Sequence, residues 1–155
     1  MIHPALYIDN SPNKGRGVYT RGAIKKNTVI EIAPVLILPP QERIWIDKSV
    51  LYDYYFLWGD DDLLTAICLG YGSVYNHSYQ PNIVYEADYA SEKITFITLK
   101  NIKAGEELVM NYNCDPDEQK RVWFEAEWFI MPMRLSQKFP KSHKYHPLPI
   151  AIGIV

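Results

Sequence analysis

The chain has 155 residues, 48% of them hydrophobic and 22% charged, which is the size of one domain with enough apolar residues for a core. This composition excludes an intrinsically disordered chain. The formal net charge of -2 argues against bulk electrostatic binding to nucleic acid, although not against a local basic patch.

The two cysteines, Cys68 and Cys114, belong to no CxxC pair and no Cys/His cluster. A structural zinc site is therefore not expected, and a disulfide between the two has no support. The first residues, Met1–Pro4, lack the charged and apolar regions of a signal peptide, and no apolar stretch reaches membrane-spanning length. We expect an intracellular, cytoplasmic protein that binds neither a metal nor a membrane.

The first part of the chain is expected to be mostly extended. Leu6–Ile8 predicts a short strand and Asp9–Asn13 a turn. The two glycines of Gly15–Gly17 allow the backbone to approach a ligand closely or to take positive φ, with a β-bulge or hairpin turn as the simpler alternative. The aliphatic and β-branched residues of Thr28–Leu38 predict a strand, in which Pro34 should lie at an edge or a bulge.

Later segments predict helices at two places. Apolar residues in Gln41–Phe56 recur at helical spacing, and Asp117–Phe129 predicts a second helix that begins at an aspartate. Between them, Ile83–Ala87, Lys93–Leu99 and Glu107–Met110 read as strands. The expected fold class is therefore mainly β with short helices.

Three polar or glycine-rich segments stand out from this background: Lys14–Tyr19 (KGRGVY), Tyr75–Asn82 (YNHSYQPN) and Gly105–Tyr112 (GEELVMNY). An Asn-His-Ser triplet inside an aromatic run needs hydrogen-bond partners if it is buried. Taken alone it fits an ordinary loop, because Asn, Ser and Pro are turn residues. The ordered set of three segments changes that interpretation.

In this order the segments resemble the signature of SET-domain lysine methyltransferases, which have a GxG, an NHS-x-x-PN and a GEEL-x-x-x-Y segment. The resemblance covers Leu6 to Phe124, and the chain looks like the compact, free-standing type without cysteine-rich zinc segments. It implies a β-clip-like SET fold of small sheets with a C-terminal pseudoknot. Two departures leave substrate preference open: Ser73-Val74 replaces a frequent Arg-Phe, and Asn111 replaces a frequent Asp.

The resemblance implies the cofactor S-adenosylmethionine and a protein substrate that offers a lysine. In the family the NHS residues hold the cofactor largely through their backbone, the GxG segment lines its other side, and aromatic residues after the domain stack on its adenine. The implied cofactor-binding residues are Lys14, Gly15, Arg16, Gly17, Asn76, His77, Tyr112, Trp123 and Phe124. The implied catalytic residues are Tyr112, at the methyl-transfer pore, and Tyr85, a second channel tyrosine.

The chemistry itself sets three requirements. The attacking amine must be neutral although a free lysine has a pKa near ~10.4, the reacting atoms must lie in line, and the site must be largely dry. A tyrosine-walled channel with backbone carbonyls meets these requirements without a metal. An alternative with the same scaffold is a non-catalytic peptide-binding or interaction module.

The domain organisation follows from the same segments. Residues 1–128 are expected to form the SET domain with a closing C-terminal helix. Residues 129–155 form an extension of unknown role, whose apolar end leaves a homodimer open.

Overall fold

The computed structural model describes residues 1–59 and 61–126, and its secondary structure there is mainly β. The chain divides into two units, Met1–Val122 and Trp123–Val155. The strands are β1 (Leu6–Ser11), β2 (Gly15–Thr20), β3 (Val29–Leu38), β4 (Tyr55–Trp58), β5 (Leu64–Cys68), β6 (Asn76–His77), β7 (Ile83–Asp88), β8 (Lys93–Thr98) and β9 (Glu107–Met110). The helices are α1 (Pro40–Ile46) and α2 (Trp123–Ala126), with 3-10 turns η1 (Val50–Asp53) and η2 (Gly72–Val74). The expected mainly-β class is confirmed.

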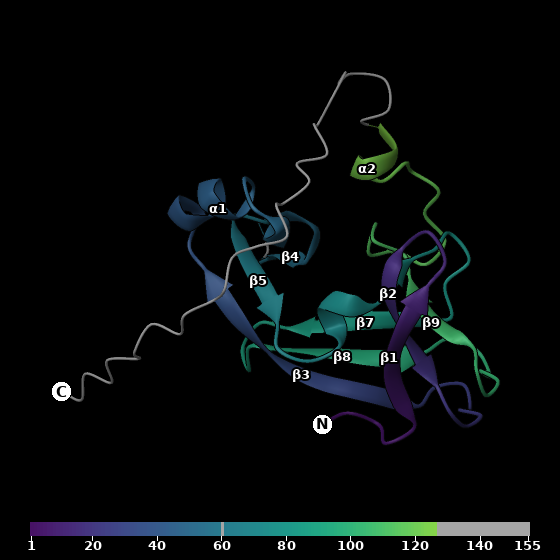
Figure 1. The fold of residues 1–155 in the computed structure, drawn as a ribbon. Helices are drawn as coiled ribbons and strands as arrows, with labels where there is room; N and C mark the ends of the chain where they lie inside the picture. The colour runs from purple at the N-terminus through teal and green to yellow at the C-terminus, as the bar shows by residue number, and fades with distance from the viewer. Residues whose placement is uncertain (60, 127–155) are drawn as a thin grey trace, which may run out of the picture. The chain divides into compact units, whose positions relative to one another are not determined.

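The first sheet has the strand order β1-β2-β9-β6. β1 and β2 form an antiparallel hairpin whose turn places Asn13 at φ 63° and Gly15 at φ 80°. β9 pairs antiparallel with β2 and parallel with β6, so the short Asn76–His77 strand is held at an edge by a strand that comes thirty residues later. The β2–β9 neighbourhood is visible in Figure 1.

The second sheet has the order β4-β5-β3-β8-β7 and is antiparallel throughout. Its long strand β3 pairs first with β8 and then with β5, and Figure 1 shows β3, β8 and β7 running across the lower part of the view. On β8 the side chains of Ile94, Phe96 and Thr98 are all fully buried on one face. The core joins them to Val18 and Leu108 of the first sheet, so both sheets share one hydrophobic cluster.

The expected helix over Gln41–Phe56 is wrong in its extent. α1 ends at Ile46, the Ser49 side chain accepts a hydrogen bond from the Leu51 N–H and starts η1, and Tyr55–Trp58 is a strand. β4 pairs with β5 from Tyr55 to Trp58, which buries Trp58 almost completely. Strand pairing and burial therefore override the helical spacing of the sequence.

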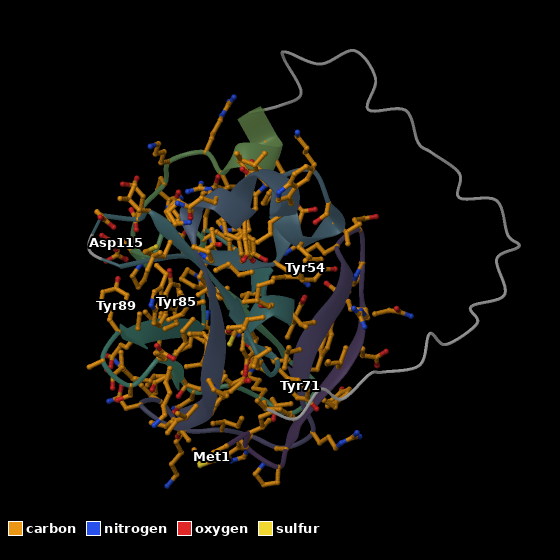
Figure 2. All side chains as sticks on the ribbon, turned by 90° about the vertical axis from the view of Figure 1, so that its left-hand side faces the viewer. Met1, Tyr54, Tyr71, Tyr85, Tyr89 and Asp115 are labelled. Atoms are coloured by element: carbon orange, nitrogen blue, oxygen red, sulfur yellow. The ribbon has the colours of Figure 1, made fainter. Side chains whose placement is uncertain are left out.

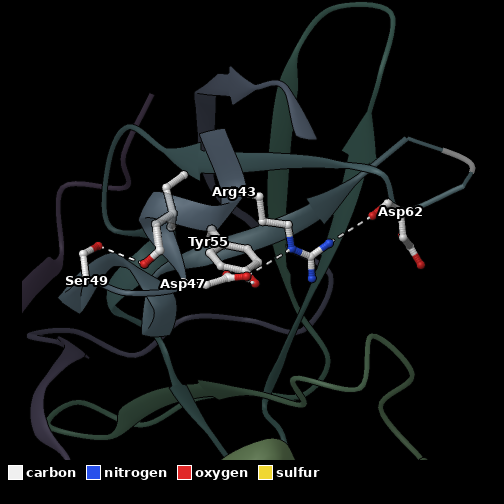
Figure 3. A network of polar contacts seen from close by, with 6 residues as sticks. Arg43, Asp47, Ser49, Tyr55 and Asp62 are labelled. Atoms are coloured by element: carbon white, nitrogen blue, oxygen red, sulfur yellow. Dashed lines mark hydrogen bonds and ion pairs between the residues drawn. The ribbon is translucent and has the colours of Figure 1, made fainter. Parts of the chain in front are cut away.

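A polar network fixes α1 against the strand that replaces its expected continuation (Figure 3). The Tyr55 hydroxyl donates to Asp47 Oδ1 at 3.0 Å, and the Arg43 guanidinium lies 5.5 Å from the centre of the Tyr55 ring. Arg43 Nε lies 3.8 Å from Asp47 Oδ2. These contacts tie the helix end to β4.

The expected second helix begins later than predicted. Among the described residues of Asp117–Phe129, only Trp123–Ala126 is helical, and the rest of the predicted helix lies outside the described residues. In the residues before α2, asparagine side chains bind backbone carbonyls that would accept hydrogen bonds in a helix. Asn111 Nδ2 donates to Glu118 O and Asn113 Nδ2 donates to Lys120 O, both at 2.7 Å. Local side-chain hydrogen bonds of Asn compete with helix formation in this way.

Two smaller expectations need correction. The first strand runs on to Ser11, so the predicted turn over Asp9–Asn13 shrinks to its last residues. Pro34 lies neither at an edge strand nor at the irregularity of β3, which falls between Val29 and Glu31. It pairs with Lys93 at the last position of the β3–β8 ladder, just before β3 changes its partner to β5. A residue without an N–H is tolerated where one ladder ends and the next begins.

Candidate active site

The three segments singled out in the sequence meet in the first sheet. Val18 of β2 is opposite Leu108 of β9, and Asn76 of β6 is opposite Val109 on the other side of β9. β9 therefore carries the glycine-rich segment on one edge and the NHS segment on the other. The expected packing of the NHS segment against the EEL segment is confirmed.

Gly17 makes this meeting close enough. A Cβ atom at this position would collide with the Glu107 carboxylate and lie 2.8 Å from Asn76 Nδ2. The absence of a side chain at Gly17 thus leaves room for Asn76 and Glu107 beside the backbone of β2.

The Asn76 carboxamide joins all three segments. Its Nδ2 donates to Arg16 O at 3.0 Å and to Glu107 Oε1 at 2.7 Å, and Glu107 Oε2 accepts from Ser11 Oγ at 3.0 Å. The side chain of Asn76 is therefore occupied within the protein. This agrees with a segment that presents its backbone, rather than the Asn76 side chain, to a ligand.

Lys14 reaches the NHS segment from the hairpin. Its Nζ donates to the backbone carbonyl of His77 at 2.9 Å. The structure thus brings Lys14, Arg16, Gly17, Asn76 and His77 together from two distant parts of the chain. Gly15 lies at the start of β2, opposite Ser11 in the hairpin.

His77 is buried and oriented by the end of the third segment. Its Nδ1 accepts a hydrogen bond from the Tyr112 N–H at 3.1 Å, which requires the neutral ring with Nδ1 unprotonated. The imidazole packs edge-on against Tyr79 at 4.4 Å and tilted against Tyr112 at 5.2 Å. The NHS and EELVMNY segments are therefore locked by both backbone and ring contacts.

The Tyr112 hydroxyl donates to the backbone carbonyl of Tyr75 at 2.8 Å. Burial raises the pKa of Tyr112 to about 12, and the negative charge of Asp53 adds to the effect. The phenol consequently keeps its proton at any physiological pH. A neutral O–H with a fixed direction is what this position offers to a reaction.

Tyr85 lies on β7 and packs against the rings of Phe56 and Phe96. Its hydroxyl shares a hydrogen bond of 2.8 Å with Cys114 Sγ, and its ring packs edge-on against Phe56 at 5.2 Å. Burial, followed by the nearby Cys114, raises the pKa of Tyr85. Figure 2 shows Tyr85 beside Tyr89. Tyr85 and Tyr75 both contact Phe96, and the Tyr75 carbonyl accepts the Tyr112 hydroxyl, so these contacts connect the two candidate catalytic tyrosines.

Asn82 is a structural residue that sequence reasoning did not single out. It is buried, its Nδ2 donates to Glu107 O at 2.7 Å, and its Oδ1 accepts from the Val109 N–H at 2.8 Å. Its side chain thus continues the pairing of β9 beyond the two residues of β6. The only sequence signal for this structural role was the position of Asn82 as the last residue of the NHS-x-x-PN segment.

Trp123 and Phe124 lie on α2, in the second unit, with ring centres 5.3 Å apart. That one of them stacks on the adenine stays a prediction. Within the described residues no group of three His, Cys, Asp or Glu side chains is arranged to hold a metal ion. Cys68 and Cys114 are both free thiols, and among the described helices none is long and apolar enough to cross a membrane.

Comparisons with known proteins agree with this geometry. The SET domain family model matches residues 15–113. A histone-lysine N-methyltransferase from Schizosaccharomyces pombe, specific for H3 lysine-37, is 34% identical over 145 residues, which is 90% of this chain and 93% of that protein. This alignment is longer than Met1–Val122 and so continues into residues 123–155, which the motif resemblance did not cover beyond Phe124.

Solved structures show the same fold. A Plasmodium falciparum protein described as a candidate histone methyltransferase superposes with a TM-score of 0.54 at 27% identity, covering 79% of this chain and 99% of its own. The autoinhibited ctPRC2 complex bound to S-adenosylmethionine gives a TM-score of 0.61 at 22% identity, over 71% of this chain and 15% of that one. The second likeness concerns the fold alone.

The chain belongs to the SET-domain family. It is an S-adenosylmethionine-dependent methyltransferase that transfers methyl groups to the side-chain amine of lysine in a protein substrate. The residues fit the cofactor, because the exposed Lys14 and Arg16 lie beside the NHS segment and the Asn76 side chain is already bonded within the protein. The enzyme is thus favoured over the non-catalytic module that the sequence left open.

The Asn76 contacts generate a prediction for cofactor binding. Asn76→Ala removes the hydrogen bonds to Arg16 O and Glu107 Oε1, so the glycine-rich and NHS segments lose the side-chain bond that joins them at Arg16. We expect the Kd for S-adenosylmethionine, measured by calorimetric titration, to rise about tenfold or more. Asn10→Ala is the matched control, because Asn10 is exposed on β1 and only its backbone is hydrogen-bonded. A folded Asn76→Ala protein with wild-type affinity would contradict the role assigned to this residue.

Proposed function

We propose that the substrate lysine of this methyltransferase lies in a histone. The observation that carries this proposal is the similarity to the H3 lysine-37 enzyme, which extends over nine-tenths of both chains rather than over the SET domain alone. A histone substrate favours the nucleus over the cytoplasm that the sequence analysis expected, and in either case an intracellular location. Homodimer formation through the extension and the expected lack of nucleic-acid binding stay predictions.

We further propose how the described residues divide the work. Lys14, Gly15, Arg16 and Gly17 line one side of the cofactor, and the backbone of Asn76 and His77 lines the other. Support comes from the strand pairing: β9 lies between β2, which carries Gly15–Gly17, and β6, which carries Asn76 and His77. Bound S-adenosylmethionine supplies an electrophilic methyl group on a sulfonium sulfur. Stacking of Trp123 or Phe124 on the adenine stays a prediction.

Tyr112 acts at the reacting centre in this proposal. Its O–H is directed at the Tyr75 carbonyl, and its oxygen accepts weak contacts that orient the methyl and amine hydrogens. The lysine amine attacks the methyl carbon, the carbon–sulfur bond breaks with its electron pair going to sulfur, and the proton of the new ammonium leaves to solvent. Desolvation of the lysine in a tyrosine-lined channel lowers its pKa and favours the neutral amine.

The histone proposal is tested with radiolabelled S-adenosylmethionine, the full chain and recombinant histone H3, free and in nucleosomes. We expect label on one lysine of H3, identified by mass spectrometry, and loss of the label when that lysine is replaced by arginine. Heat-inactivated enzyme is the control. Label on other proteins of a cell extract with none on H3 would overturn the histone substrate while leaving the methyltransferase activity in place.

Tyr112→Phe removes one hydroxyl and little volume. We expect kcat to fall about a hundredfold, with the Kd for S-adenosylmethionine little changed, because the hydroxyl orients the reacting groups. Tyr19→Phe is the matched control, since its hydroxyl also donates to a backbone carbonyl, Asn10 O at 3.2 Å. A rate near that of the wild type would reduce Tyr112 to a packing residue.

The pH dependence follows from the same phenol. With a pKa of about 12, Tyr112 stays protonated over the whole assay range. The wild-type rate should therefore rise with pH as the substrate lysine, of ordinary pKa ~10.4, loses its proton. A decline of the rate between pH 8 and about 10, with the protein still folded, would contradict a neutral Tyr112 hydroxyl.

Tyr85→Phe tests the second channel tyrosine. The substitution removes a hydrogen bond worth about 1 kcal/mol and leaves space for a water. The methylated amine can then turn more readily into the orientation that another transfer needs. We expect the product lysine to shift toward higher methylation at matched turnover, as read by mass spectrometry. Cys114→Ala removes the partner of the hydroxyl but leaves the hydroxyl itself, and so separates the two effects. An unchanged product distribution in Tyr85→Phe would return Tyr85 to the core.

A further inference from the structure

Among the described residues, Glu31 on β3 is a fully buried carboxylate that forms no ion pair, although the Met1 ammonium, which donates to the neighbouring Ile32 carbonyl, lowers its pKa. In the described part of the chain no Lys, Arg or His lies within ion-pair distance of it. Its Oε1 accepts the Tyr71 N–H at 2.7 Å, and its Oε2 accepts the Tyr75 hydroxyl at 2.9 Å. Buried carboxylates are normally paired with a cation, so this one requires an explanation.

The surrounding backbone is shaped for this carboxylate. A Cβ atom at Gly70 would collide with Glu31 Oε1, so the glycine opens the place that the carboxylate fills. Glu31 thereby fastens the turn that contains η2 and leads directly into Asn76. The turn is held from β3, a central strand of the other sheet.

The stability of the fold does not explain why a carboxylate is buried at position 31. Burial raises the pKa of Glu31, against the opposing effect of the hydrogen bonds from Tyr75 and Tyr71. A raised pKa means that folding favours the protonated form, so the stability this carboxyl contributes is present below its ordinary pKa and is lost as the pH rises through the raised value. Burial therefore makes the ionised carboxylate less favourable in the folded protein than in the unfolded chain.

Tyr75 connects this carboxylate to the active site. Its ring is buried against Phe96, with ring centres 4.9 Å apart, and its hydroxyl is held by Glu31. Its own backbone carbonyl accepts the Tyr112 hydroxyl at 2.8 Å. One residue thus has its side chain fixed to β3 and its carbonyl directed at the tyrosine of the methyl-transfer pore.

We propose that Glu31 and Tyr75 are positioning residues for methyl transfer, which act by holding the carbonyl that orients the Tyr112 hydroxyl. The proposal rests on the role of Tyr112 proposed above. Fixing the far end of the Tyr75 side chain restricts rotation about its Cα, and so fixes the direction of its carbonyl oxygen. A small displacement of that oxygen redirects the Tyr112 O–H, to which an in-line transfer is sensitive.

The main experiment is Tyr75→Phe in the full chain, assayed by steady-state kinetics with S-adenosylmethionine and recombinant H3. We expect kcat to fall about tenfold, with the KM of both substrates within about twofold of the wild type. In a Tyr112→Phe background the same change should cause no further fall. Tyr55→Phe is the matched control, because its hydroxyl also donates to a carboxylate, that of Asp47 (Figure 3). Its kcat should stay within about twofold of the wild type.

Glu31→Gln separates positioning from support of the fold. Glutamine keeps the shape but offers one acceptor oxygen instead of two, and removes the buried charge. We expect a lower kcat with an unchanged or higher midpoint of thermal unfolding. A merely structural carboxylate would give the reverse, a lower midpoint with kcat unchanged. This variant also carries the test if Tyr75→Phe fails to fold.

The inference is overturned by unchanged kcat in both variants, or by a Tyr75→Phe effect that persists in full when Tyr112 is already Phe. If wild-type enzyme leaves H3 unlabelled, the histone proposal fails and a second readout decides the inference. That readout is a double-mutant cycle of Tyr75→Phe and Tyr112→Phe in urea unfolding. Non-additive effects support the link through the Tyr75 carbonyl, and additive effects refute it.

Discussion

The placement of β9 between β2 and β6 is the constraint on which the rest of the structure depends. Its antiparallel ladder to β2 and its parallel ladder to β6 bring the glycine-rich and NHS segments to opposite edges of one strand. Because β6 has only two residues, the pairing needs reinforcement. The buried Asn82 side chain provides it by bonding the β9 backbone on both sides of Leu108. Every proposed cofactor contact in Met1–Val122 inherits its position from this arrangement.

The proposed reacting centre at Tyr112 is surrounded by neutral groups from its own segment and from the NHS segment. The Tyr112 phenol keeps its proton because it is buried, and His77 accepts a backbone N–H with an unprotonated nitrogen. Such a site suits a reaction in which a cationic methyl donor meets a neutral amine. It can fix directions through O–H groups and carbonyls while adding no competing charge. In the described residues, the one buried carboxylate, Glu31, is bonded to the Tyr75 hydroxyl rather than to the Tyr112 hydroxyl.

Tyr75 links the two sheets. It packs into the shared core, its hydroxyl donates to Glu31 on the second sheet, and its carbonyl accepts the hydroxyl of Tyr112, which follows β9 of the first sheet. The proposed reacting centre at Tyr112 is thereby connected to the core, where Phe96 contacts both Tyr75 and Tyr85.

The sequence by itself determined the family, the cofactor and the strands with strong β-branched character, because three ordered segments and local residue preferences carry that information. β9 runs over the predicted residues, Glu107–Met110. The extent of the helices was decided only by tertiary structure: the predicted helix Gln41–Phe56 includes Tyr55 and Phe56, yet pairing with β5 makes Tyr55–Trp58 a strand and buries Trp58. The contact between Glu31 and Tyr75 could not be predicted from the sequence either, because the two residues lie far apart in the chain and meet only in the folded protein. Contacts between distant segments leave no periodic pattern in the chain, and so only the fold reveals them.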